Sequence, residues 1–245
     1  MLMTYKLILD FGNTLKKIAI FHGEEQVEFQ TTDGDVVQIL EGLRRKFPEL
    51  KSAILSSVIK IDIHLMAYLR MNFKFIFFTH EIPVPIINKY QSPETLGRDR
   101  LAAAVGAVKA FPQQNVLVID AGSSITYEFI LNNGEYLGGA ISPGIKMRAK
   151  ALHTFTDQLP LVSTGNNNML IGNNTETSLK SGIVNGAIAE ISGMIASFLQ
   201  SFENIQIILT GGDAYYFEKS LKYDIFASEN LVLKGLNYIL DYNEH

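Results

Sequence analysis

The feature that most constrains the fold is a repeat at a spacing of 110 residues, from Asp10 to Asp120. Residues 7–21 read LILDFGNTLKKIAIF, and residues 117–131 read LVIDAGSSITYEFIL. In both copies an apolar run ends in Asp-x-Gly, a pair of small polar residues follows, and a second apolar segment begins. This pattern predicts two β-hairpins with similar turns, each opening one half of a duplicated chain.

Helix-like and strand-like segments alternate after each hairpin. Apolar spacing predicts helices over 36–46, 61–71, 98–111 and 178–199, and strands over 52–58, 73–78, 135–141 and 205–209. We expect connectors at 79–97 and 155–177. The sequence therefore predicts an α/β fold of two halves, residues 1–112 and 113–245. Two halves facing across a cleft would direct both Asp-x-Gly turns toward one ligand.

Composition narrows the class of protein. The chain has 245 residues, of which 47% are hydrophobic and 19% are charged, so it can bury a sizeable core. A net charge of −4 gives no electrostatic signature of a nucleic-acid binder, and the absence of cysteine excludes disulfides and thiolate chemistry. No apolar run reaches about 18 residues and no signal-peptide pattern is seen, so we expect a cytoplasmic protein without a membrane span.

The two Asp-x-Gly turns are candidate phosphate sites. Glycine lets the backbone approach a ligand closely, and the N–H groups and hydroxyls that follow can cradle phosphate. Aspartate can hold a metal ion directly or through water. Each turn alone could be an ordinary hairpin turn, and the third glycine turn at residues 210–212 could serve chain geometry only. Their joint occurrence favours a nucleotide site, although no P-loop or dinucleotide-binding motif is present.

A third cluster lies at the start of the helix predicted from residue 98. Asp99 stands there between Arg98 and Arg100. An acid is favoured in a first helical turn, which offers a purely structural interpretation. The arginines are not explained in that way, and they would suit an anionic substrate beside an ionised base. Both interpretations remain open from the residues alone. Further along, Thr177 or Ser178 is expected to be the N-cap of the longest helix.

Six motifs in order carry a resemblance to a known family. They are Asp10-x-Gly12-Asn13-Thr14, Tyr90-x-x-Pro93-x-x-x-Gly97-x-Asp99-Arg100, Asp120-x-Gly122, Gly138-Gly139-x-Ile141-x-Pro143-Gly144, Gly172-x-x-Thr175-x-x-Ser178 and Thr210-Gly211-Gly212. Together they resemble type III pantothenate kinase, of the acetate and sugar kinase/Hsp70/actin superfamily. The resemblance implies a duplicated ribonuclease H-like, actin-like ATPase fold with two mixed sheets around a nucleotide cleft.

The resemblance also implies an activity and roles for particular residues. The implied reaction is ATP-dependent phosphorylation of pantothenate by a homodimer that uses Mg²⁺ and a monovalent cation, K⁺ or NH₄⁺. Asp99 would be the base, and Asp120 would hold the monovalent cation. The implied ATP contacts are Asp10, Phe11, Gly12, Asn13, Thr14, Leu15, Lys16, Lys17 and Ser123. The implied pantothenate contacts are Tyr90, Gly97, Arg98, Asp99, Arg100 and Thr175.

The sequence departs from the family pattern in the second turn and after the strand predicted over 52–58. Ser123-Ser124 replaces the usual Thr-Ala, which keeps one hydroxyl and adds a polar group, and Lys60 stands where proline is frequent. Two rival functions remain: a kinase for another small hydroxylated substrate, and an ATP-binding regulatory protein without kinase activity. The intact segment from Gly97 to Arg100 argues against both.

Overall fold

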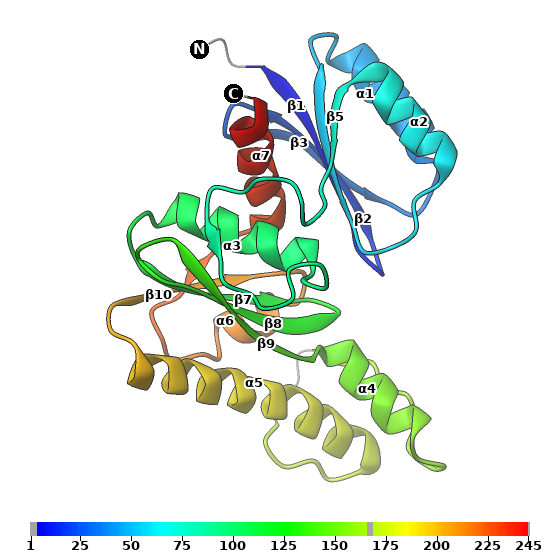
Figure 1. The fold of residues 1–245 in the computed structure, drawn as a ribbon. Helices are drawn as coiled ribbons and strands as arrows, with labels where there is room; N and C mark the ends of the chain where they lie inside the picture. The colour runs from blue at the N-terminus through cyan, green and yellow to red at the C-terminus, as the bar shows by residue number, and fades with distance from the viewer. Residues whose placement is uncertain (1–3, 166–168, 245) are drawn as a thin grey trace. The chain divides into compact units, whose positions relative to one another are not determined.

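The computed structural model describes residues 4–165 and 169–244 and divides into two compact units. One unit contains the chain up to Pro112 together with the segment from Asn230 onward, and the other is Gln113–Glu229 (Figure 1). The boundary after Pro112 is the one predicted from the sequence. The C-terminal segment, which we expected in the second half, groups with the first unit instead.

The first unit is a five-stranded mixed sheet with helices on both faces. Its elements are β1 (Tyr5–Phe11), β2 (Lys16–His22), β3 (Glu25–Thr32), α1 (Val36–Lys46), β4 (Ser52–Ser57), α2 (Ile63–Asn72), β5 (Lys74–Phe77), β6 (Ile87–Asn88), α3 (Arg98–Ala110) and α7 (Leu231–Glu244). Strands β1 to β5 form the sheet, in the order β3-β2-β1-β4-β5, and β6 is not part of it. Strand β1 is antiparallel to β2 and parallel to β4.

The second unit repeats this arrangement. Its elements are β7 (Asn115–Ala121), β8 (Ser124–Ile130), β9 (Glu135–Pro143), α4 (Ile145–Thr154), α5 (Thr175–Ser201), β10 (Ile205–Thr210), α6 (Tyr215–Glu218) and β11 (Phe226–Ala227). Its strands follow the order β9-β8-β7-β10-β11, which is the order of the first unit with each strand replaced by its counterpart. The predicted duplication and the α/β fold with two mixed sheets are therefore confirmed.

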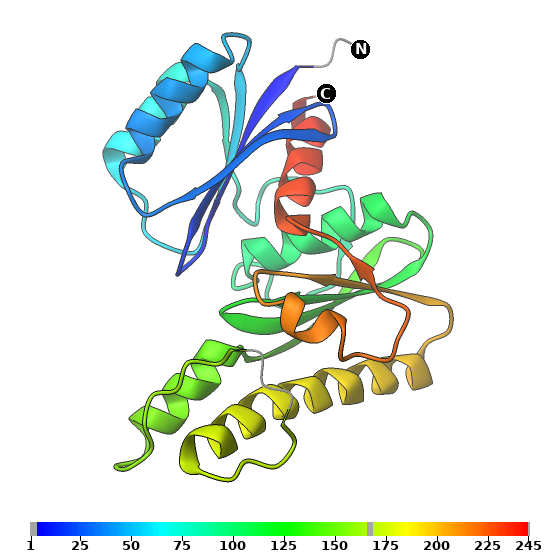
Figure 2. The same cartoon turned by 180° about the vertical axis from the view of Figure 1, so that it is seen from behind.

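The hydrophobic core of each unit lies between its sheet and a pair of helices. Leu7, Leu9 and Ile18 face Leu40 of α1 and Leu69 of α2. In the second unit α5 and α6 cover one face of the sheet (Figure 2). The turn after β1 and the turn after β7 thus lie at corresponding ends of their two sheets.

Helix α5 differs most from its prediction. It begins at Thr175 rather than at 178, and its N-cap is Asn174 rather than Thr177 or Ser178. The Asn174 side chain accepts from the Thr177 backbone N–H at 2.9 Å, and the Thr177 hydroxyl accepts from the Asn174 N–H at 3.2 Å. This reciprocal capping box satisfies two N–H groups of the first turn, which sets the earlier start. Asparagines 166–168 of the predicted loop lie outside the described residues.

Helix α5 is also long and apolar enough to cross a membrane by length and composition, and it is the one such helix in the described part of the chain. Only 28% of its most apolar 18-residue window is buried. Ile183, Ala187, Ile191 and Ile195 face the core. We therefore interpret α5 as a core helix whose outer face is left uncovered by this chain.

The C-terminal helix α7 joins the first unit through close packing against α3. A Cβ atom at Gly235 would lie 1.8 Å from the Ala102 carbonyl oxygen, and one at Gly106 would lie 2.7 Å from the Leu231 carbonyl oxygen. The Lys6 Nζ atom, on a side chain that is 2% exposed, lies 2.6 Å from Asp241 Oδ1. These contacts explain why the end of the chain belongs with the first unit, and they fix α3 from one side.

We expect Gly235→Ala to destabilise the first unit, although alanine favours helix formation. The added methyl would separate α3 from α7, because backbone atoms cannot move aside as a flexible side chain can. Overpacking of this kind lowers the free energy of unfolding by about 1–3 kcal/mol. Urea unfolding measures the change. Gly42→Ala in α1, where no atom lies within 4 Å of the added carbon, is the matched control. It should raise stability by up to about 1 kcal/mol, and equal effects at both sites would contradict the packing account.

Candidate active site

The first Asp-x-Gly turn is closed by backbone hydrogen bonds. The Gly12 N–H donates to the Leu15 carbonyl at 3.0 Å, and the Val58 N–H donates to the Phe11 carbonyl at 3.0 Å. Asp10 is 7% exposed and lies 4.0 Å from Lys17 Nζ across the hairpin. Asn13, Thr14 and Leu15 are exposed at the tip. The turn thus presents a buried carboxylate at its base and polar groups at its tip, an arrangement that can hold phosphate and a cation.

Ser56 extends this turn, and it was not among the residues assigned a role from the sequence. It is the register partner of Asp10 in the parallel pair β1–β4, so the two side chains stand on the same face of the sheet. Its hydroxyl is fully buried and has no hydrogen-bond partner within the described residues. A buried hydroxyl beside a carboxylate suits a divalent cation and its water shell, so these residues fit the implied Mg²⁺. Only a run of small residues after an apolar strand could have pointed to it.

The second Asp-x-Gly turn is enclosed by two glycines. The Gly122 N–H donates to the Ser124 carbonyl at 2.9 Å. A Cβ atom at Gly144 would lie 2.2 Å from the Gly122 carbonyl oxygen, and one at Gly211 would lie 2.2 Å from the Ala121 carbonyl oxygen. Gly211 also has φ +98°, which disfavours other residues.

Asp120 and the exposed Ser123 are therefore held by three backbone segments, the turn itself and the strand ends before Gly144 and Gly211. After residues 210–212 the chain forms the single-turn helix α6, whose four residues begin at Tyr215.

The amino end of α3 carries the acid–arginine cluster. Gly97 is the N-cap residue of α3, and it makes no capping hydrogen bond because it has no side chain. The Asp99 Oδ1 atom accepts from the Arg100 backbone N–H at 2.8 Å. A Cβ atom at Gly97 would lie 2.6 Å from that oxygen, so glycine leaves room for the carboxylate. The buried Arg100 guanidinium lies 5.7 Å from the centre of the Tyr90 ring. The predicted residues Tyr90, Gly97, Asp99 and Arg100 thus form one local group.

The two terminal nitrogens of Arg98 differ in their hydrogen bonding. Its Nη2 atom donates to the carbonyls of Pro93 at 3.0 Å and Glu94 at 2.9 Å, which fixes the loop after Tyr90. Its Nη1 atom is buried and has no partner among the residues described. Burial lowers the pKa of Arg98, and the charge of Glu94 counteracts this effect. A buried guanidinium N–H without a partner is suited to donate to an anionic group of a substrate.

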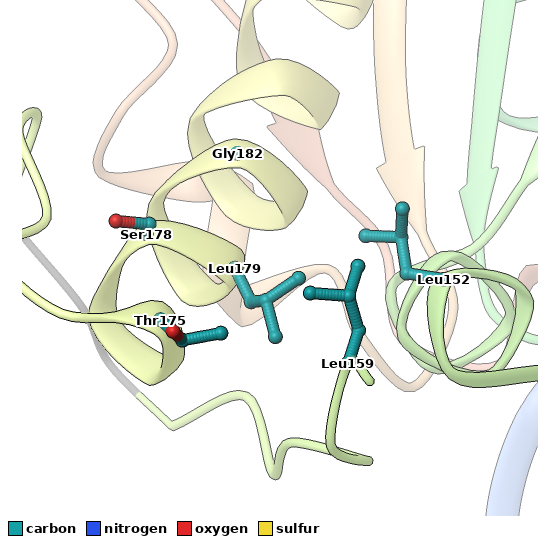
Figure 3. A pocket seen from close by; sticks show the side chains of 6 residues that line it. All are labelled: Leu152, Leu159, Thr175, Ser178, Leu179 and Gly182. Atoms are coloured by element: carbon teal, nitrogen blue, oxygen red, sulfur yellow. The ribbon is translucent and has the colours of Figure 1, made fainter. Parts of the chain in front are cut away.

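Thr175 lies apart from these groups in sequence and lines a pocket in the second unit. The pocket has a volume of about 410 Å³ and is lined by Leu152, Leu159, Thr175, Ser178, Leu179 and Gly182. Figure 3 shows the three leucine side chains pointing toward one another between α4 and the start of α5. The pocket is therefore mainly apolar with a polar edge.

The predicted residues fall into separate groups. The first turn and the α3 cluster belong to the first unit, whereas Asp120, Ser123 and Thr175 belong to the second. Within residues 4–165 and 169–244, no group of three or more His, Asp or Glu side chains could hold a metal ion unaided. Any cation here would accordingly need ligands from substrate or water, as is usual for Mg²⁺ at phosphate sites. The roles of the individual residues stay predictions.

Sequence comparison identifies relatives over nearly the whole chain. The sequence model of the type III pantothenate kinase family matches residues 6–197. A type III pantothenate kinase of Christiangramia forsetii is 43% identical over 239 residues, covering 97% of this chain and 98% of the relative. A protein of the same description from Phocaeicola vulgatus is 45% identical over 239 residues, with the same coverage.

Structure comparison supports the fold. A conserved Campylobacter jejuni protein, provisionally described as a Baf family transcriptional activator, aligns with TM-score 0.62 and 24% identity over 97% of this chain and 98% of that one. A ROK hexokinase from Thermus thermophilus aligns with TM-score 0.54 and 14% identity over 98% of this chain and 100% of that one. These likenesses show a duplicated ribonuclease H-like fold and no more. Because the family match and the curated relatives span most of the sequence, the chain belongs to the type III pantothenate kinase family.

Proposed function

We propose that the protein transfers the γ-phosphoryl group of ATP to the primary hydroxyl of pantothenate and forms 4'-phosphopantothenate, the first step of coenzyme A synthesis. The observation that carries this proposal is the group Tyr90, Arg98, Asp99 and Arg100 at the start of α3, in a chain matched by the family over residues 6–197. We place the enzyme in the cytoplasm as a soluble protein.

The acceptor half of the reaction is assigned to the α3 cluster. The buried Nη1 atom of Arg98 has no partner among the residues that the structure describes, so it can bind the carboxylate of pantothenate. Asp99 accepts the proton of the attacking hydroxyl, and its carboxylate is oriented by the Arg100 N–H. Since phosphoryl transfer passes through a loose transition state, positioning and electrostatics contribute most of the rate and the base contributes the remainder.

The donor half is assigned to the two Asp-x-Gly turns. Asp10, with the buried Ser56 hydroxyl beside it, would hold Mg²⁺ and its waters. When bound, this ion neutralises charge on the β- and γ-phosphates.

Asp120 would hold K⁺ or NH₄⁺, and Ser123 would contact the phosphates. Gly211 supports the cation role because a Cβ there would lie 2.5 Å from Asp120 Oδ1, so its absence leaves space at the carboxylate.

The proposed function is tested by measuring ADP release with ATP, Mg²⁺ and K⁺, with and without pantothenate. We expect ADP release that depends on pantothenate and is not supported by hexoses or simple hydroxy acids. Turnover with one of those acceptors and none with pantothenate would favour the rival kinase. ATP binding without turnover on any acceptor would favour the regulatory rival.

We predict that Asp99→Asn lowers kcat by about 10²–10³, because the carboxamide retains the size of the side chain but loses its basicity. Binding of ATP should change little, since the proposed phosphate turns are built from other segments. Steady-state kinetics and a nucleotide titration on the same preparation provide the measurement.

A purely structural role predicts another result for the same variant. Asp99 would then matter only through its bond to the Arg100 N–H, and its replacement would cost about 0.5–2 kcal/mol of stability without loss of kcat. Wild-type turnover in a folded Asp99→Asn protein would overturn the base assignment.

We predict that activity requires K⁺ or NH₄⁺ and is poor in Na⁺. The Asp120 carboxylate lies in a turn that would also approach phosphate, so it needs a counter-charge. Rates are to be compared in the three chloride salts at equal ionic strength. Asp120→Asn should abolish the preference for K⁺ over Na⁺. Equal wild-type rates in all three salts would remove the cation role from Asp120.

A homodimer is supported by exposed apolar side chains in the second unit. Phe155, Leu170 and Ile171 are 85%, 78% and 80% exposed, and they flank the segments that line the Thr175 pocket. Exposed apolar surface of this kind marks association sites. We propose that a second copy covers this surface and the outer face of α5, and that Thr175 thereby completes a pantothenate site.

We predict a dimer of about 55 kDa, twice the 27.3 kDa chain, by light scattering at micromolar concentration. Replacement of Leu170 and Ile171 by aspartate should shift the mass toward the monomer and reduce pantothenate turnover. Aspartate at Met71, which is 84% exposed on α2, is the control and should leave the dimer intact. A fully active wild-type monomer would contradict the proposal.

A further inference from the structure

Arg148 on α4 holds the chain segment that precedes its own helix. Its Nε atom donates to the Pro143 carbonyl at 2.8 Å, and its Nη2 atom donates to the Ser142 hydroxyl at 3.0 Å. The same Nη2 atom donates to a carboxylate oxygen of Glu190. The Arg148 side chain is 20% exposed and the Glu190 side chain 30%, so both are largely shielded from water. One guanidinium therefore binds the end of β9 and, at the same time, the middle of α5.

Glu190 is in turn fixed from the sheet. Its Oε1 atom accepts from the hydroxyl of the buried Tyr127 on β8 at 3.2 Å. Burial raises the pKa of Glu190, but the hydrogen bonds from Arg148 and Ser142 outweigh it, so this pKa lies below its usual range. Burial, reinforced by the charge of Glu190, raises the pKa of Tyr127. The carboxylate is thus charged at neutral pH and bridges β8, α4 and α5.

The segment that Arg148 holds is also a wall of the second Asp-x-Gly turn. Ser124 and Pro143 are register partners in the β8–β9 pair, and the Gly144 N–H donates to the Ser123 carbonyl at 3.3 Å. Gly144 lies so close that an added Cβ would be 2.2 Å from the Gly122 carbonyl oxygen. A shift of the segment from Ser142 to Gly144 must therefore move the turn that carries Asp120 and Ser123.

We infer that the Arg148–Glu190 ion pair is a positioning device for the nucleotide and cation turn, acting through Pro143 and Gly144. The hydrogen bonds of the two side chains go to Ser142, Pro143, Tyr127 and each other. The pair fixes the wall against which the turn packs, and Tyr127 fixes Glu190. The inference rests on the proposed kinase function for its kinetic consequences, whereas its consequence for nucleotide binding can be measured without turnover.

Two variants test the inference. Glu190→Gln is isosteric and retains one of the two acceptor oxygens that Tyr127 and Arg148 use, so it should fold while the ionic contact with Arg148 is lost. Arg148→Met retains the length of the side chain and removes every donor. In both, we expect the KM for ATP and the half-saturating K⁺ concentration to rise about three- to tenfold, as is typical for coupled contacts. The KM for pantothenate should change by less than about twofold. In the double variant, the KM for ATP and the half-saturating K⁺ concentration should be only slightly higher than in either single variant.

Glu28→Gln is the matched control. Glu28 is also 30% exposed and pairs with Lys46, but it lies on β3 of the first unit. The Glu28→Gln variant should leave the KM for ATP, the KM for pantothenate and the half-saturating K⁺ concentration unchanged. Melting temperatures and titration with a fluorescent ATP analogue accompany the kinetics, and the analogue should bind more weakly to both test variants.

A merely structural pair would lower the melting temperature and leave the ATP and K⁺ constants at wild-type values, which would overturn the inference. Equal changes in the ATP, K⁺ and pantothenate constants would overturn it as well. If Arg148→Met does not fold, Glu190→Gln decides alone. If the wild type phosphorylates no pantothenate, the proposed function fails, and analogue binding to wild type and Glu190→Gln still decides the positioning role.

Discussion

The close approach of backbone to backbone around the second Asp-x-Gly turn is the constraint on which the site depends. The carbonyls of Ala121 and Gly122 lie against Gly211 and Gly144, at distances that admit no side chain. Because backbone atoms cannot change rotamer, the position of Asp120 follows from the positions of two strand ends. The first turn is held differently, by a tight hairpin in which Gly12 bonds to Leu15. The duplicated fold thus supports two turns of similar sequence that are held by different contacts.

The same kind of contact explains how the C-terminal helix bears on the chemistry. Helix α7 packs on α3 through Gly106 and Gly235, and the buried Lys6 of β1 pairs with Asp241. Helix α3 carries Asp99 and Arg100 at its amino end. The placement of these side chains therefore depends on the last residues of the chain as well as on the loop that Arg98 holds. A substitution that displaces α7 should therefore shift α3 and the proposed acceptor site, although these residues are distant in sequence.

Much of the fold could be predicted from the sequence because the repeat marks both hairpins directly. The missed elements have physical reasons. Strand β3 alternates exposed and half-buried residues and contains no fully buried one, so it gives no apolar run. The place of α7 depends on glycine contacts with α3, which no local pattern encodes. The N-cap of α5 was misassigned because Asn174, Thr177 and Ser178 are all good capping residues, and only the reciprocal bonds decide among them.

In the candidate active site, the Arg98–Arg100 segment could be found from the sequence by its charges. The buried Ser56 hydroxyl and the Arg148–Glu190 pair could not be found in this way, because they depend on burial and on contacts between distant segments.

The central claim is that the cluster at the start of α3 directs ATP chemistry to the primary hydroxyl of pantothenate. The most direct measurement is the identity of the product formed from ATP and pantothenate, by mass spectrometry together with phosphorus NMR. The account predicts one phosphate monoester at the primary hydroxyl, formed in equal amount to ADP. Release of inorganic phosphate in its place, or phosphorylation at the secondary hydroxyl, would contradict it.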